Sequence, residues 1–234
     1  MTEAQMNGEE EKVIEKASVR QTNLRWLMLV FGCLFLMASY FCYDNPTPLK
    51  DYLQASPYDL NDKQYNLLFA VYTFPNMFLP LCGGIFMDKI GIRPGLLLFT
   101  TVLTIGQFVF ALGGAQNKFW LMLMGRAIFG LGGECMSVAQ SAIVSRWFKG
   151  KELSFAFGLN LSVARLGSVL NGIILPRVAE SNDGLIGEAL FIGFGVCLFS
   201  LAMGIMLVVV DFWADKKDGG SEVKLGDEDK FKFK

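Results

Sequence analysis

The sequence predicts an all-α membrane protein whose core is a bundle of six transmembrane helices. Hydrophobic residues make up 53% of the 234 residues, and the mean hydropathy is +0.40. A helix needs about 20 mostly apolar residues to cross the hydrocarbon of a bilayer. Six windows meet this requirement, at residues 24–43, 65–87, 95–114, 119–143, 152–176 and 188–212. The lipid bilayer is therefore the expected surrounding of the central part of the chain.

The segments between the windows have the composition of tails and loops. Residues 1–23 form a charged tail, which together with the length of the first window argues against a secretory signal peptide. The loop after the first window, DNPTPLKDYLQASPYDLNDKQ, contains Asn-Pro and Ser-Pro steps that favour turns. Residues 213–234 form a second charged tail, so the predicted bundle covers residues 24–212.

The distribution of basic residues predicts the orientation. Lys and Arg accumulate in cytosolic loops. Here most of the 21 basic residues lie in the two tails, between the second and third windows, and between the fourth and fifth. Both termini are therefore expected in the cytosol. Because the basic residues follow membrane topology and the net charge is only −1, no nucleic-acid partner is expected.

Several enzyme and metal sites are excluded by composition. The chain has no histidine, which removes HExxH zinc sites and Ser-His dyads, and it has neither a GxSxG elbow nor a GxxxxGK[ST] phosphate loop. The five cysteines all fall inside predicted helices without CxxC spacing. We therefore expect no catalytic residues, no metal site and no cofactor.

Three charged residues inside the windows are the main functional signal. Glu134 and Arg165 fall near the midplane on consecutive helices, and Arg126 lies about 12 Å from Glu134 toward the outer side. Charged residues at this depth are costly and are a functional hypothesis by default. One interpretation is a zwitterion site, in which Glu134 attracts an ammonium group and Arg165 holds a carboxylate. The alternatives are a structural Glu134–Arg165 bridge and a packing role for Arg126.

Polar uncharged residues accompany these charges. Tyr72 and Asn160 are polar groups in or beside the predicted helices, where they either line a cavity or bridge neighbouring helices. We include both among the candidate substrate-binding residues, with Glu134, Arg165 and Arg126.

The loop between the second and third windows carries a recognisable motif. GGIFMDKIGIRPG resembles the cytosolic loop signature of the major facilitator superfamily, with Gly84, Asp88, Lys89, Gly91 and Arg93 at its defining positions. GRAIFGLGG similarly resembles the helix 4 motif of that superfamily. The resemblance implies a gating role for the loop residues. It also implies twelve helices in two halves, of which this chain supplies the N-terminal six, so a second six-helix half is an expected partner.

Longer stretches narrow the resemblance to lysosomal dipeptide transporters within this superfamily. They are SYFCYDNP, FALGG, GRAIFGLGGE, SVAQ, WFKGKEL, FGLNLSVARLGS and SEVKLGDEDKF. The resemblance implies dipeptide transport across the lysosomal membrane, contact of Glu134 and Arg165 with the peptide termini, and a glycosylated lysosomal membrane protein as accessory partner. The absence of a usable N-glycosylation sequon in the predicted external loops agrees with such a partner.

Two alternatives to dipeptide transport stay open at this stage. The chain is either a truncated, regulatory or scaffolding subunit that does not transport, or a transporter of another small solute such as a sugar or an organic anion. Proton coupling and facilitated diffusion also both stay open.

Overall fold

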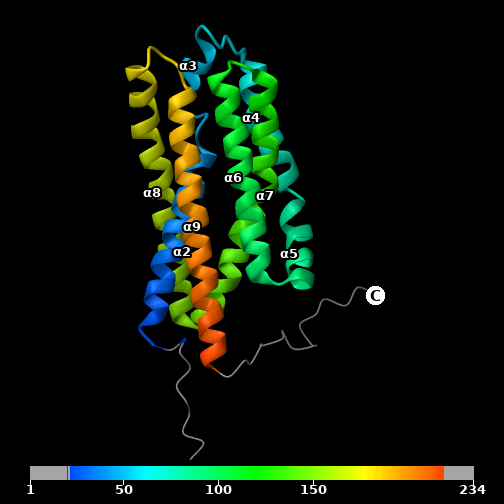
Figure 1. Cartoon of the computed structure of the whole chain (residues 1–234), viewed down its shortest axis with the longest axis vertical. Helices are drawn as coiled ribbons and strands as arrows, with labels where there is room; N and C mark the ends of the chain where they lie inside the picture. The colour runs from blue at the N-terminus through cyan, green and yellow to red at the C-terminus, as the bar shows by residue number, and fades with distance from the viewer. Residues whose placement is uncertain (1–19, 21, 219–234) are drawn as a thin grey trace, which may run out of the picture.

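The computed structural model describes residue 20 and residues 22–218, and the regular structure in that part of the chain is helical (Figure 1). The helices are α2 (Leu24–Tyr43), α3 (Lys50–Gln54), α4 (Asp62–Asn76), α5 (Leu79–Ile90), α6 (Ile92–Ala115), α7 (Phe119–Trp147), α8 (Lys151–Ser181) and α9 (Gly187–Lys217). Most of the two predicted charged tails lies outside the described residues. The last helix continues to Lys217, beyond the predicted end of the bundle at residue 212. The all-α fold class is confirmed.

The predicted spans are all present, but the second is divided. Among the described residues, five helices are long and apolar enough to cross a membrane, and α4 with α5 passes the same test as one pair bent by 47°. The bend follows from two prolines, whose effect on the backbone an average of hydropathy does not detect. Pro75 near the end of α4 cannot donate a backbone hydrogen bond, and Pro80 lies in the first turn of α5. Between them the backbone turns through the bonds from Met77 N to Phe74 O and from Phe78 N to Pro75 O.

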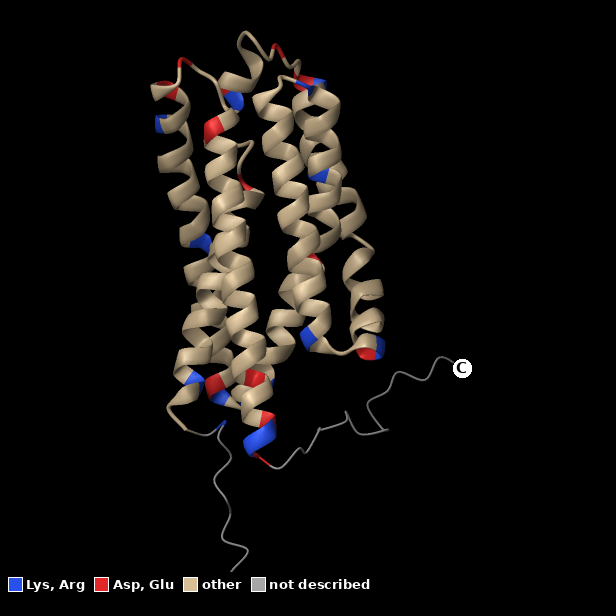
Figure 2. Ribbon diagram, viewed as in Figure 1, with Lys and Arg blue, Asp and Glu red and all other residues tan. Residues whose placement is uncertain are grey.

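The helices pack as a single bundle with two distinct ends. α6 contacts both α7 and α9, α2 contacts α8 and α9, and α4 contacts α7. We call the end at which α2 begins and α9 ends the terminal end, and the end that carries α3 the loop end (Figure 1). Figure 2 shows that most Lys, Arg, Asp and Glu positions lie at these two ends. The middle of the bundle is therefore mostly apolar, as a bilayer favours, and Arg126, Glu134 and Arg165 are the charged residues of its helices there.

The loop after α2 folds over the loop end. The Tyr58 hydroxyl donates to the Gly114 carbonyl at 3.0 Å and accepts from the Ile186 backbone N–H at 3.2 Å. It thus ties the loop to the end of α6 and to the start of α9. Because Tyr58 is buried, the pKa of its phenol is raised above the ordinary value, so the hydroxyl stays neutral and keeps its proton for this bond.

Close approach of α2 and α8 depends on one glycine, and this gives a prediction for stability. A Cβ atom on Gly167 would fall on the backbone carbonyl of Met37, whereas one on Gly158 would meet nothing within 4 Å. We expect Gly167→Val to destabilise the fold by about 1–3 kcal/mol through overpacking. Gly158→Val, the same change on the same helix, should alter stability by less than about 0.5 kcal/mol. Thermal unfolding of the two purified variants tests this, and equal melting temperatures would contradict it.

Candidate substrate-binding site

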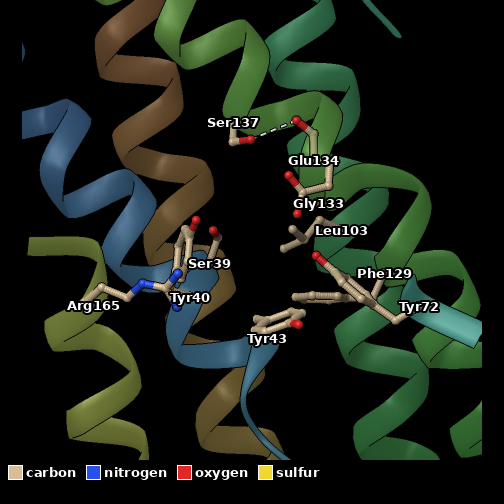
Figure 3. Close-up of a pocket in the computed structure, with 10 residues that line it drawn as sticks. All are labelled: Ser39, Tyr40, Tyr43, Tyr72, Leu103, Phe129, Gly133, Glu134, Ser137 and Arg165. Carbon is tan, nitrogen blue, oxygen red and sulfur yellow. Dashed lines mark hydrogen bonds between the residues drawn. The ribbon is translucent and has the colours of Figure 1, made fainter. Parts of the chain in front are cut away.

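A pocket of about 160 Å³ opens between five helices near the middle of the bundle (Figure 3). Its walls come from α2, α4, α6, α7 and α8, so residues distant in sequence meet here. The lining residues are Ser39, Tyr40, Tyr43, Tyr72, Leu103, Phe129, Gly133, Glu134, Ser137 and Arg165. Pockets between the helices of a bundle are frequent ligand sites.

The structure brings Glu134 and Arg165 to this pocket from opposite sides (Figure 3). Glu134 is half-buried on α7 and Arg165 is exposed on α8. No ion pair joins the two side chains in the described part of the chain. The Arg165 guanidinium instead lies 5.0 Å from the centre of the Tyr40 ring. The acid and the base therefore lie on opposite sides of the pocket and are not joined as a structural bridge.

Aromatic rings form another wall of the pocket. The Tyr43 and Tyr72 rings meet edge-on with centroids 4.8 Å apart, and the Tyr72 and Phe129 centroids are 5.8 Å apart. Tyr72, a sequence-predicted site residue, thus lines the pocket. Tyr hydroxyls next to apolar faces suit a ligand with both polar and hydrocarbon parts.

Arg126 lies behind this wall and does not line the pocket. Its side chain is 0% exposed and donates to the backbone carbonyls of Cys42 at 3.3 Å and Tyr43 at 2.9 Å. Those carbonyls belong to the last turn of α2, where helical acceptors lack partners within the helix. The guanidinium is also 5.5 Å from the centres of the Tyr72 and Phe129 rings. Its position supports the pocket wall from outside.

Asn160 also lies apart from the pocket. It is buried in α8, nearer the terminal end than Arg165, and the residue is 3% exposed. Its neighbour there is Gln140 of α7, since atoms of both side chains approach Gly32 on α2. The predicted substrate-binding residues therefore do not all meet. Glu134, Arg165 and Tyr72 line the pocket, whereas Asn160 lies outside it.

The motif residues between α5 and α6 lie at the terminal end. Asp88 and Lys89 are exposed at the end of α5, and Gly84 lies one turn earlier. Gly91 has φ +101°, a conformation that favours glycine, and it caps both α5 and α6. Arg93 turns inward from the start of α6 toward α9.

Arg93 belongs to a charge cluster that the sequence analysis did not identify. The Asp211 carboxylate on α9 is 0% exposed and accepts from Arg93 Nε at 2.8 Å and from Trp147 Nε1 at 2.8 Å. Arg20 and Arg146 approach the same carboxylate at 3.3 Å and 3.6 Å. Asp215, one turn later, also pairs with Arg20 and Arg93. The available signal was the sequence DFWAD, which places two carboxylates one turn apart at the end of an apolar helix.

The fold and motifs agree with the comparison to known protein families. Residues 27–230 match the Major Facilitator Superfamily. The chain belongs to this superfamily. The loop motif at Gly84–Arg93 and the six-span bundle are thus those of one half of a major facilitator fold, as the sequence resemblance predicted.

Individual relatives include proteins named as lysosomal dipeptide transporters. The chain is 40% identical over 212 residues to the lysosomal dipeptide transporter MFSD1 of Danio rerio, covering 87% of this chain and 46% of that protein. It is 40% identical over 218 residues to the human protein of the same name, covering 87% of this chain and 47% of the relative. A tetracycline resistance protein, class D, of Salmonella ordonez is 32% identical over 142 residues, 57% of this chain and 34% of that protein. This major facilitator chain thus spans about half the length of the lysosomal relatives that it matches.

Proposed function

We propose that this chain forms one six-helix half of a transporter that carries zwitterionic dipeptides across the lysosomal membrane by alternating access. The observation that carries the proposal is the placement of Glu134 and Arg165 on opposite sides of one pocket without an ion pair between them. The names of the relatives that match most of this chain support the same substrate.

The two charges have complementary roles in this proposal. Glu134 binds the peptide ammonium group, and Arg165 binds the carboxylate through its planar guanidinium, which can engage both carboxylate oxygens. Tyr40 keeps Arg165 in place through its ring. Tyr72 contacts the ligand from the aromatic wall, while Arg126 acts by fixing the backbone of Tyr43.

A second six-helix half is the proposed partner that closes the pocket. With six helices alone, the half-buried Glu134 and the exposed Arg165 would lie next to lipid at an appreciable cost. Large apolar side chains are exposed along α8 and around the α4–α5 bend, at Phe74, Met77, Phe78, Leu81, Phe155, Leu161, Leu166 and Val169. These surfaces suit contact with the other half and with lipid.

The proposed orientation places the terminal end in the cytosol. The basic residues of the tails and of the α5–α6 and α7–α8 loops favour it. Asp88 and Lys89 are exposed at this end, where they are free to contact the second half when the cytosolic side closes. Gly84, Gly91 and Arg93 shape the turn and anchor it to α9.

A glycosylated lysosomal membrane protein is the proposed accessory partner. Asn45-Pro46-Thr47 is not an acceptor for N-glycosylation because of its proline, and the sequon at Asn160 lies inside α8 with its asparagine buried. On the lumenal side such a partner would supply the glycan cover that the described loops of this chain lack.

Ligand-dependent stabilisation of the purified chain tests the dipeptide proposal. We expect alanyl-alanine to raise the unfolding free energy, by about 2.7 kcal/mol at a hundred times its Kd. N-acetyl-alanyl-alanine and alanyl-alanine amide should stabilise much less, because each lacks one charged terminus. Equal stabilisation by all three compounds would favour another solute. No stabilisation by any of them would favour a subunit that does not itself bind substrate.

A further inference from the structure

Two buried carboxamides near the pocket have no hydrogen-bond partners. Gln140 on α7 is 1% exposed and Asn160 on α8 is 3% exposed. Within the part of the chain that the structure describes, both polar atoms of each side chain are unpaired. Buried polar groups in proteins are paired in the great majority of cases, so four unpaired atoms at one place require an explanation.

The two side chains are neighbours because α2 has a glycine opposite them. A Cβ atom on Gly32 would lie 2.7 Å from Gln140 Nε2 and 3.5 Å from Asn160 Oδ1. The amide atoms therefore converge on one small region between α2, α7 and α8. The same three helices supply Glu134, Arg165 and Tyr40 to the pocket.

The amide pair lies beyond the pocket toward the terminal end. Gln140 is six residues past Glu134 on α7, and Asn160 is five residues before Arg165 on α8. At 1.5 Å per residue, both are displaced by about 8–9 Å, and the antiparallel helices make the two displacements point the same way. In the proposed orientation, a ligand that leaves the pocket for the cytosol passes the amide pair.

The chemistry of the pair matches the part of a dipeptide that Glu134 and Arg165 leave unbound. A carboxamide offers N–H donors and a carbonyl acceptor, which is the complement of the N–H and C=O of a peptide bond. We propose that Gln140 and Asn160 form a second station that binds the peptide group of the substrate on its way to the cytosol. This inference rests on the proposed function. The station is closed in the present conformation and opens when the cytosolic route opens.

A station of this kind also distinguishes peptides from free amino acids. Buried groups that are arranged to hydrogen-bond a substrate discriminate against analogues that lack the matching group. A free amino acid has both charged termini and satisfies Glu134 and Arg165, but it has no peptide bond to pair with Gln140 and Asn160.

N-acetyl-alanine methylamide is the probe that separates the two stations. It contains two peptide groups and no charged terminus, so it can use the amide pair but not the pocket charges. We expect the purified chain to bind it weakly, with unchanged affinity in Glu134→Gln and an affinity lowered about three- to tenfold in Gln140→Met or Asn160→Leu. Saturation-transfer NMR with the chain in detergent micelles measures these affinities.

Gln107→Met is the matched control. Gln107 is also a fully buried glutamine, but it lies on α6 and its Nε2 donates to the Leu190 carbonyl at 3.2 Å. The control variant should bind the probe as the original chain does. The second station is overturned if the original chain does not bind the probe, or if Gln140→Met and Asn160→Leu bind it equally well. Either result leaves the dipeptide proposal intact, provided that binding of alanyl-alanine still depends on both of its charged termini. If the chain does not bind alanyl-alanine at all, both proposals are wrong.

Discussion

In Glu134→Gln, the affinity for alanyl-alanine is expected to fall by about 30- to 150-fold, or 2–3 kcal/mol, because a charge-assisted hydrogen bond to the ammonium group is lost. Arg165→Gln should reduce it by a similar factor through the carboxylate. Gln keeps a polar side chain in both cases, so the pocket stays polar. Calorimetric titration of each purified variant gives the Kd values.

Blocked ligands then show which residue binds which terminus. In Glu134→Gln, acetylation of the dipeptide should cost no further affinity, while amidation still should. In Arg165→Gln the pattern should be reversed. Ser137→Ala is the control, since the Ser137 hydroxyl lines the pocket but donates to the backbone carbonyl of residue 134 at 2.9 Å. If, in each variant, neither acetylation nor amidation of the dipeptide changes the affinity any longer, the two residues act only by maintaining the pocket.

Apolar length was sufficient to predict the spans, because the bilayer imposes it on any helix that crosses the hydrocarbon. The prediction that Glu134 and Arg165 share a depth needed only the antiparallel order of two consecutive helices and the rise per residue. The pocket between them agrees with that prediction. The bend at Pro75 was not predicted, since mean hydropathy does not register which backbone donor a proline removes.

The contacts of Arg126, Asn160 and Asp211 could not be derived in the same way. Depth along a helix is fixed by sequence position, but the neighbouring helix that each face meets depends on the packing of the whole bundle. Arg126 faces the end of α2 and four aromatic rings, and Asn160 faces Gln140 and Gly32. The partners of Asp211 come from α6, α7 and the segment before α2, which no local pattern connects.

Asp211→Asn is expected to lower the unfolding free energy by about 3 kcal/mol, the lower end of the cost of removing one partner from a buried ion pair. The Asp211 carboxylate is 0% exposed, whereas the arginine side chains around it are 16–31% exposed and can still reach water. Asn retains an oxygen that accepts from Trp147, so the change removes charge rather than shape. Thermal unfolding in detergent measures the loss.

Asp88→Asn is the matched control for this prediction, because Asp88 is an exposed carboxylate at the same end of the bundle. It should leave the stability of this chain within about 0.5 kcal/mol, as surface substitutions usually do. Asp215→Asn should fall between the two, since the Asp215 side chain is 17% exposed and its pairs are partly screened. An Asp211→Asn variant as stable as Asp88→Asn would show that the cluster does not hold α9 to the bundle.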